Sequence, residues 1–257
     1  MTLLTEIKNR SLVITLNRPK ERNALNAVLI QALQSTLTMH QDDANIRTII
    51  LQGAGEHFCA GADIKHMQHL MQASHDDNVQ DAKQLAELLW QLYSYPKPVI
   101  TLCHGATLGG GIGLLAASDI VLSKAHATFS FSEVKLGIIP AIISPYVLRV
   151  IGMRAMHRYV LTGERFDAEK ALRLGLVHTI VLDMNPLDRA LIMADMIAHN
   201  SPSAITAAKK LMLTLDAQPL DYAHATAMAE QLASIRQTNE AQEGFNAFIE
   251  KRLPDWR

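Results

Sequence analysis

Short apolar runs that end in glycine or proline alternate, over most of the chain, with stretches whose apolar positions recur at helical spacing. Residues 12–16 form such a run, which Asn17-Arg18-Pro19 ends, and the apolar positions of 24–37 repeat with a helical period. Strands are also predicted at 48–53, 97–102, 120–123, 127–134 and 177–181, and helices at 144–151 and 168–174. This alternation predicts an α/β core.

The pattern changes after about Pro186. Residues 187–198, 203–215 and 220–248 are helical in composition, with no convincing strand between them. A start signal stands at Ser201-Pro202, where a capping serine precedes a proline suited to a first helical turn. We therefore divide the chain into an α/β core, residues 1–195, and a helical region, residues 196–257.

Composition narrows the class of protein. The chain has 257 residues, 49% of them hydrophobic, which is enough to bury one large core. Lys and Arg number 24 against 25 Asp and Glu, without blocks of like charge, so neither nucleic acid nor a membrane surface is an expected partner. The two cysteines, Cys59 and Cys103, lack metal-site spacing and are predicted to be reduced and buried.

Residues 98–118 are a stretch of twenty-one residues without Asp, Glu, Lys or Arg, which is long enough to cross a bilayer. The stretch contains Pro98 and five glycines, and each glycine costs a helix roughly 1 kcal/mol relative to alanine. We interpret it as a buried strand, a glycine loop and a buried helix. Charged residues among the first sixteen argue against a secretory signal, so a cytoplasmic location is expected.

Two glycine-containing loops are candidates for ligand binding. Phe58-Cys59-Ala60-Gly61-Ala62-Asp63-Ile64 offers small residues where a backbone approaches a ligand, or it is an ordinary tight connection. The loop at 104–113 runs into an apolar helix, and backbone N–H groups from two such loops can form an oxyanion hole. Gly111-x-Gly113-x-x-Ala116 also matches a degenerate dinucleotide fingerprint, but the preceding strand ends too early for it.

Glu133 is the candidate acid or base. If the strand at 127–134 persists to Glu133, its carboxylate shares a face with Phe129 and Phe131, and burial then raises its pKa toward neutrality. If the strand ends at Ser132, Glu133 is a surface partner of Lys135. The sequence leaves both interpretations open.

The segment from His66 to Gln84 is polar and weakly periodic. His66 and His69, followed by His75, Asp76 and Asp77, allow a metal site, but a lid over a pocket with solvated histidines is the favoured interpretation, and we predict no metal. GxSxG, HExxH and GxxxxGK[ST] motifs do not occur in the sequence, which disfavours serine hydrolases, zinc proteases and P-loop proteins.

The ordered motifs together resemble the enoyl-CoA hydratase/isomerase (crotonase) family. They are Asn17-Arg18-Pro19 with Asn23-Ala24-Leu25-Asn26, then 58–64, 105–119 and 131–140, with a further match at 243–254. The resemblance implies a spiral of ββα turns followed by a helical trimerisation region, assembled as a homotrimer or homohexamer. It also implies an acyl-CoA substrate and no cofactor besides that coenzyme A thioester.

The resemblance further implies roles for individual residues. The amides of Ala62 and Gly110 match the donors that hold the thioester oxygen, and Glu133 matches one of two catalytic glutamates. The positions that match CoA-binding residues are Ala24, Ala60, Asp63, Ile64, Phe245 and Lys251.

The chain departs from the family pattern at Gly113, which occupies the position of the first glutamate and offers no side-chain proton. The predicted function is hydration of a short or branched enoyl-CoA, catalysed by a single acid–base residue, Glu133. An enoyl-CoA double-bond isomerase and a non-catalytic acyl-CoA-binding protein are the alternatives. Residues 132–137 and 143–147 look most like a methylglutaconyl-CoA hydratase-like subgroup associated with leucine breakdown, with Ser144 or Arg149 as candidate partners for an acyl carboxylate.

Overall fold

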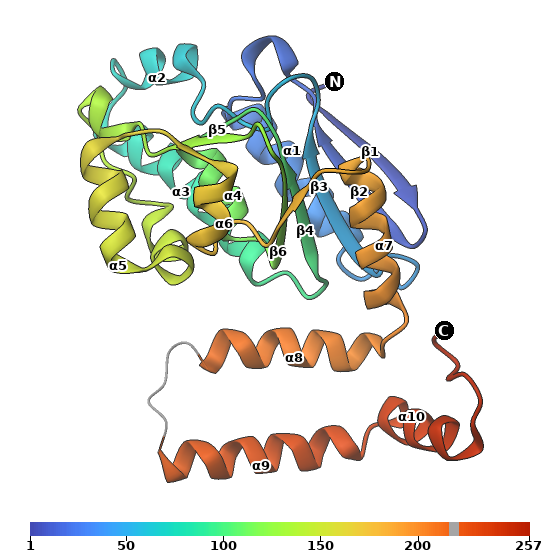
Figure 1. The fold of residues 1–257 in the computed structure, drawn as a ribbon. Coiled ribbons are helices and arrows are strands. Elements are labelled where there is room, and N and C mark those ends of the chain that lie inside the picture. The colour runs from blue at the N-terminus through green and yellow to red at the C-terminus, as the bar shows by residue number, and fades with distance from the viewer. Residues whose placement is uncertain (216–220) are drawn as a thin grey trace.

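A six-stranded sheet forms the centre of the molecule, as a computed structural model that describes residues 1–215 and 221–257 shows (Figure 1). Its strand order is β1-β2-β3-β4-β6-β9, with β1 antiparallel to β2 and every other neighbouring pair parallel. The strands are β1 (Leu3–Lys8), β2 (Ser11–Leu16), β3 (Thr48–Gly53), β4 (Val99–Cys103), β6 (Ile120–Lys124) and β9 (Thr179–Val181). The predicted α/β core is therefore present.

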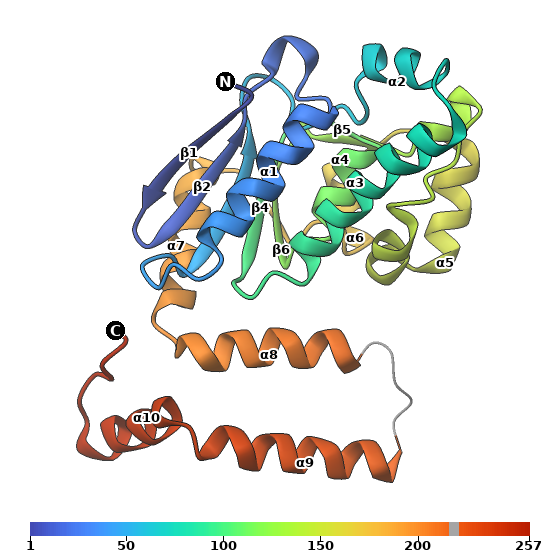
Figure 2. The ribbon, with the colours of Figure 1, turned by 180° about the vertical axis from the view of Figure 1, so that it is seen from behind.

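Helices cover both faces of this sheet because alternate strand residues point to opposite sides. On one face, Ile14 and Leu51 pack with α1 (Ala27–His40), α3 (His75–Tyr93) and α4 (Gly110–Ala116). On the other face, Val13 and Ile50 pack against Ala190 of α7 (Pro186–Ala198). Figures 1 and 2 show α1 and α7 on opposite sides of the sheet.

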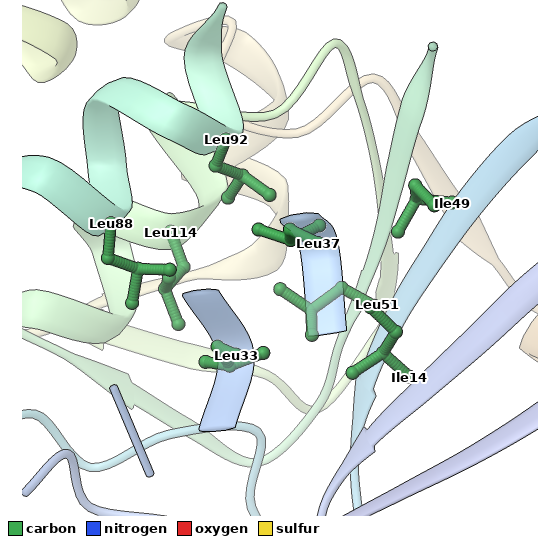
Figure 3. Close-up of a pocket in the computed structure, with 8 residues that line it drawn as sticks. All are labelled: Ile14, Leu33, Leu37, Ile49, Leu51, Leu88, Leu92 and Leu114. Carbon is green, nitrogen blue, oxygen red and sulfur yellow. The ribbon is translucent and has the colours of Figure 1, made fainter. Parts of the chain in front are cut away.

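The apolar interior between the sheet and α1, α3 and α4 holds a small void of about 10 Å³. Figure 3 shows its lining, which consists of Ile14, Leu33, Leu37, Ile49, Leu51, Leu88, Leu92 and Leu114. Every one of these side chains is at most 2% exposed. The void is about the size of one water molecule and has no polar lining, so it is a packing defect of the core and not a ligand site.

A second, three-stranded sheet lies beside α4. Its order is β5-β7-β8, formed by β5 (Ala106–Leu108), β7 (Thr128–Ser130) and β8 (Phe166–Asp167). Around it lie η1 (Pro19–Glu21), α2 (Ile64–Leu70), η2 (Glu133–Leu136), α5 (Ser144–Thr162) and α6 (Ala168–Arg173). The expected strand at 127–134 thus ends at Ser130, before Glu133, and the expected loop at 104–113 contains the short strand β5.

Other element boundaries also differ from the prediction. β1 escaped prediction because, as an edge strand, it buries only Leu3 and carries no apolar run. The helix expected at 144–151 extends to Thr162, with a non-helical break at Gly152. The segment 98–118 is a buried strand, a loop with β5 and the helix α4, as predicted, and both cysteines are free and buried. No helix in the described ranges is long and apolar enough to cross a membrane.

The C-terminal helices α8 (Pro202–Leu215), α9 (Tyr222–Arg236) and α10 (Asn239–Glu250) project from the core (Figure 1). Ser201 caps α8 as predicted, since its Oγ accepts a hydrogen bond from the amide of Ala204 at 3.1 Å. The expected helical segment 220–248 begins at Leu220, outside the described residues. The proposed boundary after residue 195 falls inside α7, which packs on the sheet.

One buried ion pair fixes α8 to the core. Lys209 is only 5% exposed, and its Nζ lies 2.6 Å from a carboxylate oxygen of Asp119 and 3.2 Å from the carbonyl oxygen of Lys97. The same oxygen of Asp119 accepts a hydrogen bond from the amide of Val99 at 2.7 Å. The helical region therefore has a defined attachment at the start of β4.

Candidate active site

The two glycine-containing loops lie side by side. The amide of Leu108 donates to the carbonyl of Cys59 at 2.9 Å, and the amide of Cys59 donates to Ala106 at 3.3 Å. A Cβ on Gly61 would lie 3.1 Å from the carbonyl oxygen of Leu108, and the φ of Gly61 is +90°. Only glycine combines this backbone conformation with such a close approach, so the contact brings the loop that carries Ala62 beside the loop that leads to Gly110.

The amides of Ala62 and Gly110 are available to a ligand. Leu25 donates its N–H to Gly61 at 2.7 Å and accepts from Asp63 at 2.8 Å, so both neighbours of Ala62 are held. Gly110 is the first residue of α4, where N–H groups lack intrahelical acceptors. Neither the Ala62 nor the Gly110 amide donates a hydrogen bond to another described residue. Two unpaired donors on adjacent loops are what an oxyanion hole requires.

Glu133 lies beside these loops. Its Oε1 is 3.0 Å from the position that a Cβ on Gly109 would take, directly before Gly110. Its Oε2 is buried and finds no hydrogen-bond partner among the residues that the structure describes. Burial raises the pKa of the Glu133 carboxyl above its usual range. A carboxyl group of this kind is suited to exchanging protons near neutral pH.

Both interpretations of Glu133 from the sequence were wrong in part. Glu133 is half-buried with its Oε2 fully buried, which agrees in part with the first interpretation, but β7 ends at Ser130 and Glu133 begins the short helix η2, so strand alternation does not aim it. The second proposed a surface pair with Lys135, which the buried and unpartnered Oε2 contradicts. The turn after β7 carries Glu133 toward Gly109 instead.

Arg18 and Asn23 hold the loop at 58–64 and the residues before it in place. The sequence pattern indicated no such role for them. A guanidinium nitrogen of Arg18 lies 2.6 Å from the carboxylate of Asp63, and another donates to the carbonyl of Ala24. Asn23 is fully buried, and its side-chain amide donates to the carbonyls of Ala54 and His57 at 2.9 and 2.8 Å. The Asn-Arg-Pro motif was the available signal, but its partners are distant in sequence.

Asp63 has a structural task at this position. It caps α2 by accepting hydrogen bonds from the amides of Lys65 and His66 at 2.9 and 3.3 Å. Burial by itself raises the pKa of Asp63, but the hydrogen bonds from Arg18 and from the two amides outweigh it and lower the pKa. Asp63 is therefore an ionised carboxylate that is already paired.

Of the predicted CoA-binding residues, Asp63 lines a surface hollow of about 320 Å³. The hollow is lined by Arg18, Asn26, Ala27, Val28, Asp63, Lys65 and His66. Within this lining Arg18 is paired with Asp63 and His66 lies 2.6 Å from Asp81, so Lys65 is the cation that it offers to an anionic ligand. Ala24 is buried, Ala60 is half-buried, and Ile64 is exposed at the start of α2.

Phe245 and Lys251 do not join this site within one chain. Phe245 lies in α10, and Lys251 directly follows that helix. Figures 1 and 2 both show α10 and α2 at opposite ends of the molecule. Any contact of these two residues with a ligand at the loops therefore requires a neighbouring copy of the chain.

Metal and thiol chemistry find no support in the described residues. No cluster of three or more His, Cys, Asp or Glu side chains in ranges 1–215 and 221–257 has a geometry that could hold a metal ion. The polar segment from His66 to Gln84 lies mostly in the helices α2 and α3. An imidazole nitrogen of His66 in α2 lies 2.6 Å from a carboxylate oxygen of Asp81 in α3 and so links the two helices. Burial raises the pKa of both Cys59 and Cys103 to about 12, and a thiol of such pKa is a poor nucleophile.

Ser144 and Arg149, the candidate partners for an acyl carboxylate, both have intrachain acceptors. The hydroxyl of Ser144 donates to the carbonyl of Pro140 at 2.7 Å. The guanidinium of Arg149 donates to the carbonyl of Pro145 at 2.7 Å. Both bonds lie within the first turns of α5 and its approach.

The α/β fold, the two unpaired amides and the Glu133 carboxyl together form a candidate acid–base site of an enzyme. The sequence profile of the family described as "Enoyl-CoA hydratase/isomerase" matches residues 6–257, and the chain belongs to that family. The predicted crotonase-like fold is confirmed by a solved enoyl-CoA hydratase from Shewanella pealeana, with a TM-score of 0.96 at 39% identity, which covers 100% of this chain and 96% of that one.

Two relatives illustrate the range of acyl groups in proteins similar to this chain. The 2,3-dehydroadipyl-CoA hydratase of Escherichia coli is 32% identical, over 99% of this chain and 98% of that protein. The mevalonyl-coenzyme A hydratase sidH of Aspergillus fumigatus is 33% identical, over 96% of this chain and 91% of that protein. Because the chain belongs to this family, the interpretation of the Gly111 motif as a dinucleotide-binding fingerprint of a dehydrogenase is wrong. The early end of β4 at Cys103 already indicated this.

Proposed function

We propose that the protein is an enoyl-CoA hydratase that adds water across the 2,3 double bond of a short or branched enoyl-CoA. The observation that carries the proposal is the position of the Glu133 carboxyl next to the Gly109–Gly110 backbone, with its Oε2 buried and without a partner among the described residues. Family membership supports an acyl-CoA thioester as the substrate. The hydratase names of the relatives support hydration as the reaction.

In the proposed mechanism the thioester oxygen accepts hydrogen bonds from the Ala62 and Gly110 amides. The Glu133 carboxylate removes a proton from water as the water oxygen bonds to C3, and the electron pair of the double bond moves into a thioester enolate. The enolate then takes the proton back from Glu133 at C2, which restores the carboxylate. One group serves as base and then acid, and loss of one donor from such a hole typically costs about 3 to 4 kcal/mol.

Coenzyme A is expected to lie along the hollow that Arg18, Lys65 and His66 line, with Ala24, Ala60, Asp63 and Ile64 nearby. Phe245 and Lys251 of a neighbouring copy complete the binding site in this proposal. Exposed apolar side chains on the tail, such as Phe248 at 84% and Ile249 at 75%, support assembly of the chain into a trimer or hexamer. Neither CoA binding nor the assembly of the chain needs a metal or a second cofactor in this proposal. We expect the protein to act in the cytoplasm.

Double-bond isomerisation is the second candidate, and Gly113 argues less strongly against it than against hydration. Moving a proton between two carbons needs only one carboxyl group, so the missing side chain at 113 does not weaken this alternative. A non-catalytic acyl-CoA-binding protein would bind the thioester without turnover. A methylglutaconyl group is one branched candidate, but the backbone hydrogen bonds of Ser144 and Arg149 give no support to recognition of its carboxylate.

The test is incubation of the purified protein with crotonyl-CoA, 3-methylcrotonyl-CoA and 3-methylglutaconyl-CoA in oxygen-18 water, followed by mass spectrometry. Hydration predicts a product that gains one labelled water. Bond migration without labelled oxygen would replace the proposal with an isomerase. Binding of all three thioesters without any conversion would support the non-catalytic alternative.

A further inference from the structure

The space beside Gly113 is filled by two apolar side chains. A Cβ on Gly113 would lie 2.4 Å from Cγ2 and 3.2 Å from Cβ of Ile143, and 3.2 Å from Cδ1 of Leu89. Ile143 is 3% exposed and Leu89 is fully buried. Carbon atoms in contact prefer separations of about 3.5 to 4.0 Å. No side chain at position 113 fits unless these neighbours move.

The backbone itself does not require glycine at this position. Gly113 lies inside α4 and is absent from the glycines with positive φ. At Gly111, by contrast, an added Cβ would meet a backbone atom, the carbonyl oxygen of Cys59, at 2.6 Å. At Gly113 the three nearest obstacles all belong to side chains, so packing alone excludes a larger residue there.

Ile143 also connects Gly113 to the segment that carries the acid–base group. It is the N-cap residue of α5, and residues 137–142 connect it to η2, which begins at Glu133. Gly113 follows Gly110 by three positions in α4, so both lie on the same side of that helix. The side chain of Ile143 therefore lies where a group at 113 would project from the helix that begins with the Gly110 amide.

We propose that Ile143 is a specificity-determining residue that keeps the site to a single carboxyl group. By packing on Gly113 it closes the space that a glutamate side chain would need, so Glu133 alone handles the proton and the attacking water. The inference rests on the proposed function, since it concerns the number of acid–base groups at that site. It makes Gly113 and Ile143 a coupled pair: a carboxyl group at 113 requires a smaller residue at 143.

The packing half is tested by thermal unfolding of Gly113→Ala, Ile143→Ala and the double variant. Overpacking costs about 1 to 3 kcal/mol, so Gly113→Ala should lower the melting temperature by about 3 to 10 °C. In the Ile143→Ala background, Gly113→Ala should lower the melting temperature by less than about half of that amount. Ile142→Ala, a half-buried neighbour, is the matched control and should leave the cost of Gly113→Ala unchanged. Equal costs in all three backgrounds would overturn the proposal.

The catalytic half is tested with Gly113→Glu alone and combined with Ile143→Ala, on crotonyl-CoA. A positioned second acid or base contributes about 10²- to 10⁴-fold, so the double variant should hydrate at least about tenfold faster than Ile143→Ala alone. Gly113→Glu alone should be less stable and gain nothing. The proposal would be overturned if Gly113→Glu alone gained as much hydration rate as the double variant. It would also be overturned if the double variant regained its stability but hydrated no faster than Ile143→Ala alone. A wild-type protein without any turnover, with the packing coupling intact, would reject the proposed function only.

Discussion

Glu133 combines two properties that conflict in an ordinary folded protein. Its Oε2 is buried without a hydrogen-bond partner among the described residues, and an unpartnered buried oxygen destabilises the fold. The same burial raises the pKa of the carboxyl group, which brings its proton exchange closer to neutral pH. The arrangement does not favour stability, and the proposed acid–base role of Glu133 accounts for it.

The stability cost can be measured with Glu133→Gln. A carboxyl whose pKa is raised by folding contributes its full stabilisation below the pKa of the unfolded chain, about 4.5, and loses that contribution as pH rises through its folded pKa. Glutamine carries no charge to desolvate. We expect the variant to melt above the wild type at neutral pH, with the difference shrinking as pH falls toward 4.5. Calorimetry across pH checks this, and a variant less stable at neutral pH contradicts it.

At the residue scale the sequence singled out Glu133 as the candidate acid–base group but could not place it. Alternation with Phe129 and Phe131 indicated burial, although the strand that supported the argument stops at Ser130. The absence of a side chain at Gly113 was visible, but its physical reason was not. Ile143 contacts that position only in the folded chain, so no local pattern reports the pair.

At the scale of elements, the loop that carries Ala62 is fixed by the ion pair of Arg18 with Asp63. Their side chains are 13% and 9% exposed, which is buried enough for the pair to matter. Asp63 also caps α2, and its amide bonds to Leu25 beside Ala62. Through its carboxylate Asp63 thus joins the start of α2 to the Asn-Arg-Pro loop, and through its backbone amide it fixes the chain beside the candidate oxyanion donor Ala62.

Asp63→Asn should expose this role. Asparagine keeps the helix cap but leaves Arg18 unpaired, and breaking a buried pair costs about 3 to 5 kcal/mol. We expect the melting temperature to fall by about 6 to 15 °C, with partial recovery when Arg18→Met is added. Glu6→Gln, which disrupts an exposed pair with Lys8, is the matched control and should change little. A loss no larger than the control's would show that the pair does not fix the loop.

The types and order of most elements followed from sequence, but several boundaries did not. Buried parallel strands such as β3 and β4 are continuous apolar runs, which local patterns detect. The edge strand β1 pairs with β2 and buries only Leu3, so its existence depends on its partner. α5 extends beyond its predicted end because its continuation past Gly152 packs on the core through residues such as Tyr159.

The whole molecule consists of an α/β core and a tail whose apolar side chains face outward. Phe248, Ile249 and Leu253 are 84%, 75% and 64% exposed in the single chain. Lys209 holds α8 on the core, while α10 lies farther away (Figure 2). Large exposed apolar side chains that cluster in one region mark an interaction surface, and a second copy of the chain is the partner that the proposed function requires.

Phe248→Glu tests the assembly. A charge in a buried apolar contact is strongly unfavourable, so the variant should shift the protein from a trimer or hexamer toward monomer, as sedimentation velocity measures. CoA-ester affinity should fall with it if Phe245 and Lys251 act from a neighbouring copy. Met39→Glu, at an equally exposed apolar position outside the tail, is the control. A wild-type protein that is monomeric at micromolar concentration would contradict the proposal.

The most direct test of the account is the steady-state kinetics of Glu133→Gln on the best enoyl-CoA substrate, with the dissociation constant of a non-reactive CoA thioester measured in parallel. Glutamine keeps the size of the side chain but can neither take nor return a proton. We predict that kcat falls by at least about 10²-fold while the dissociation constant stays within about threefold of the wild-type value, and that wild-type kcat/KM declines on the acidic side at a pH above the ordinary glutamate value. An unchanged kcat would contradict the assignment of Glu133 as the single acid–base group.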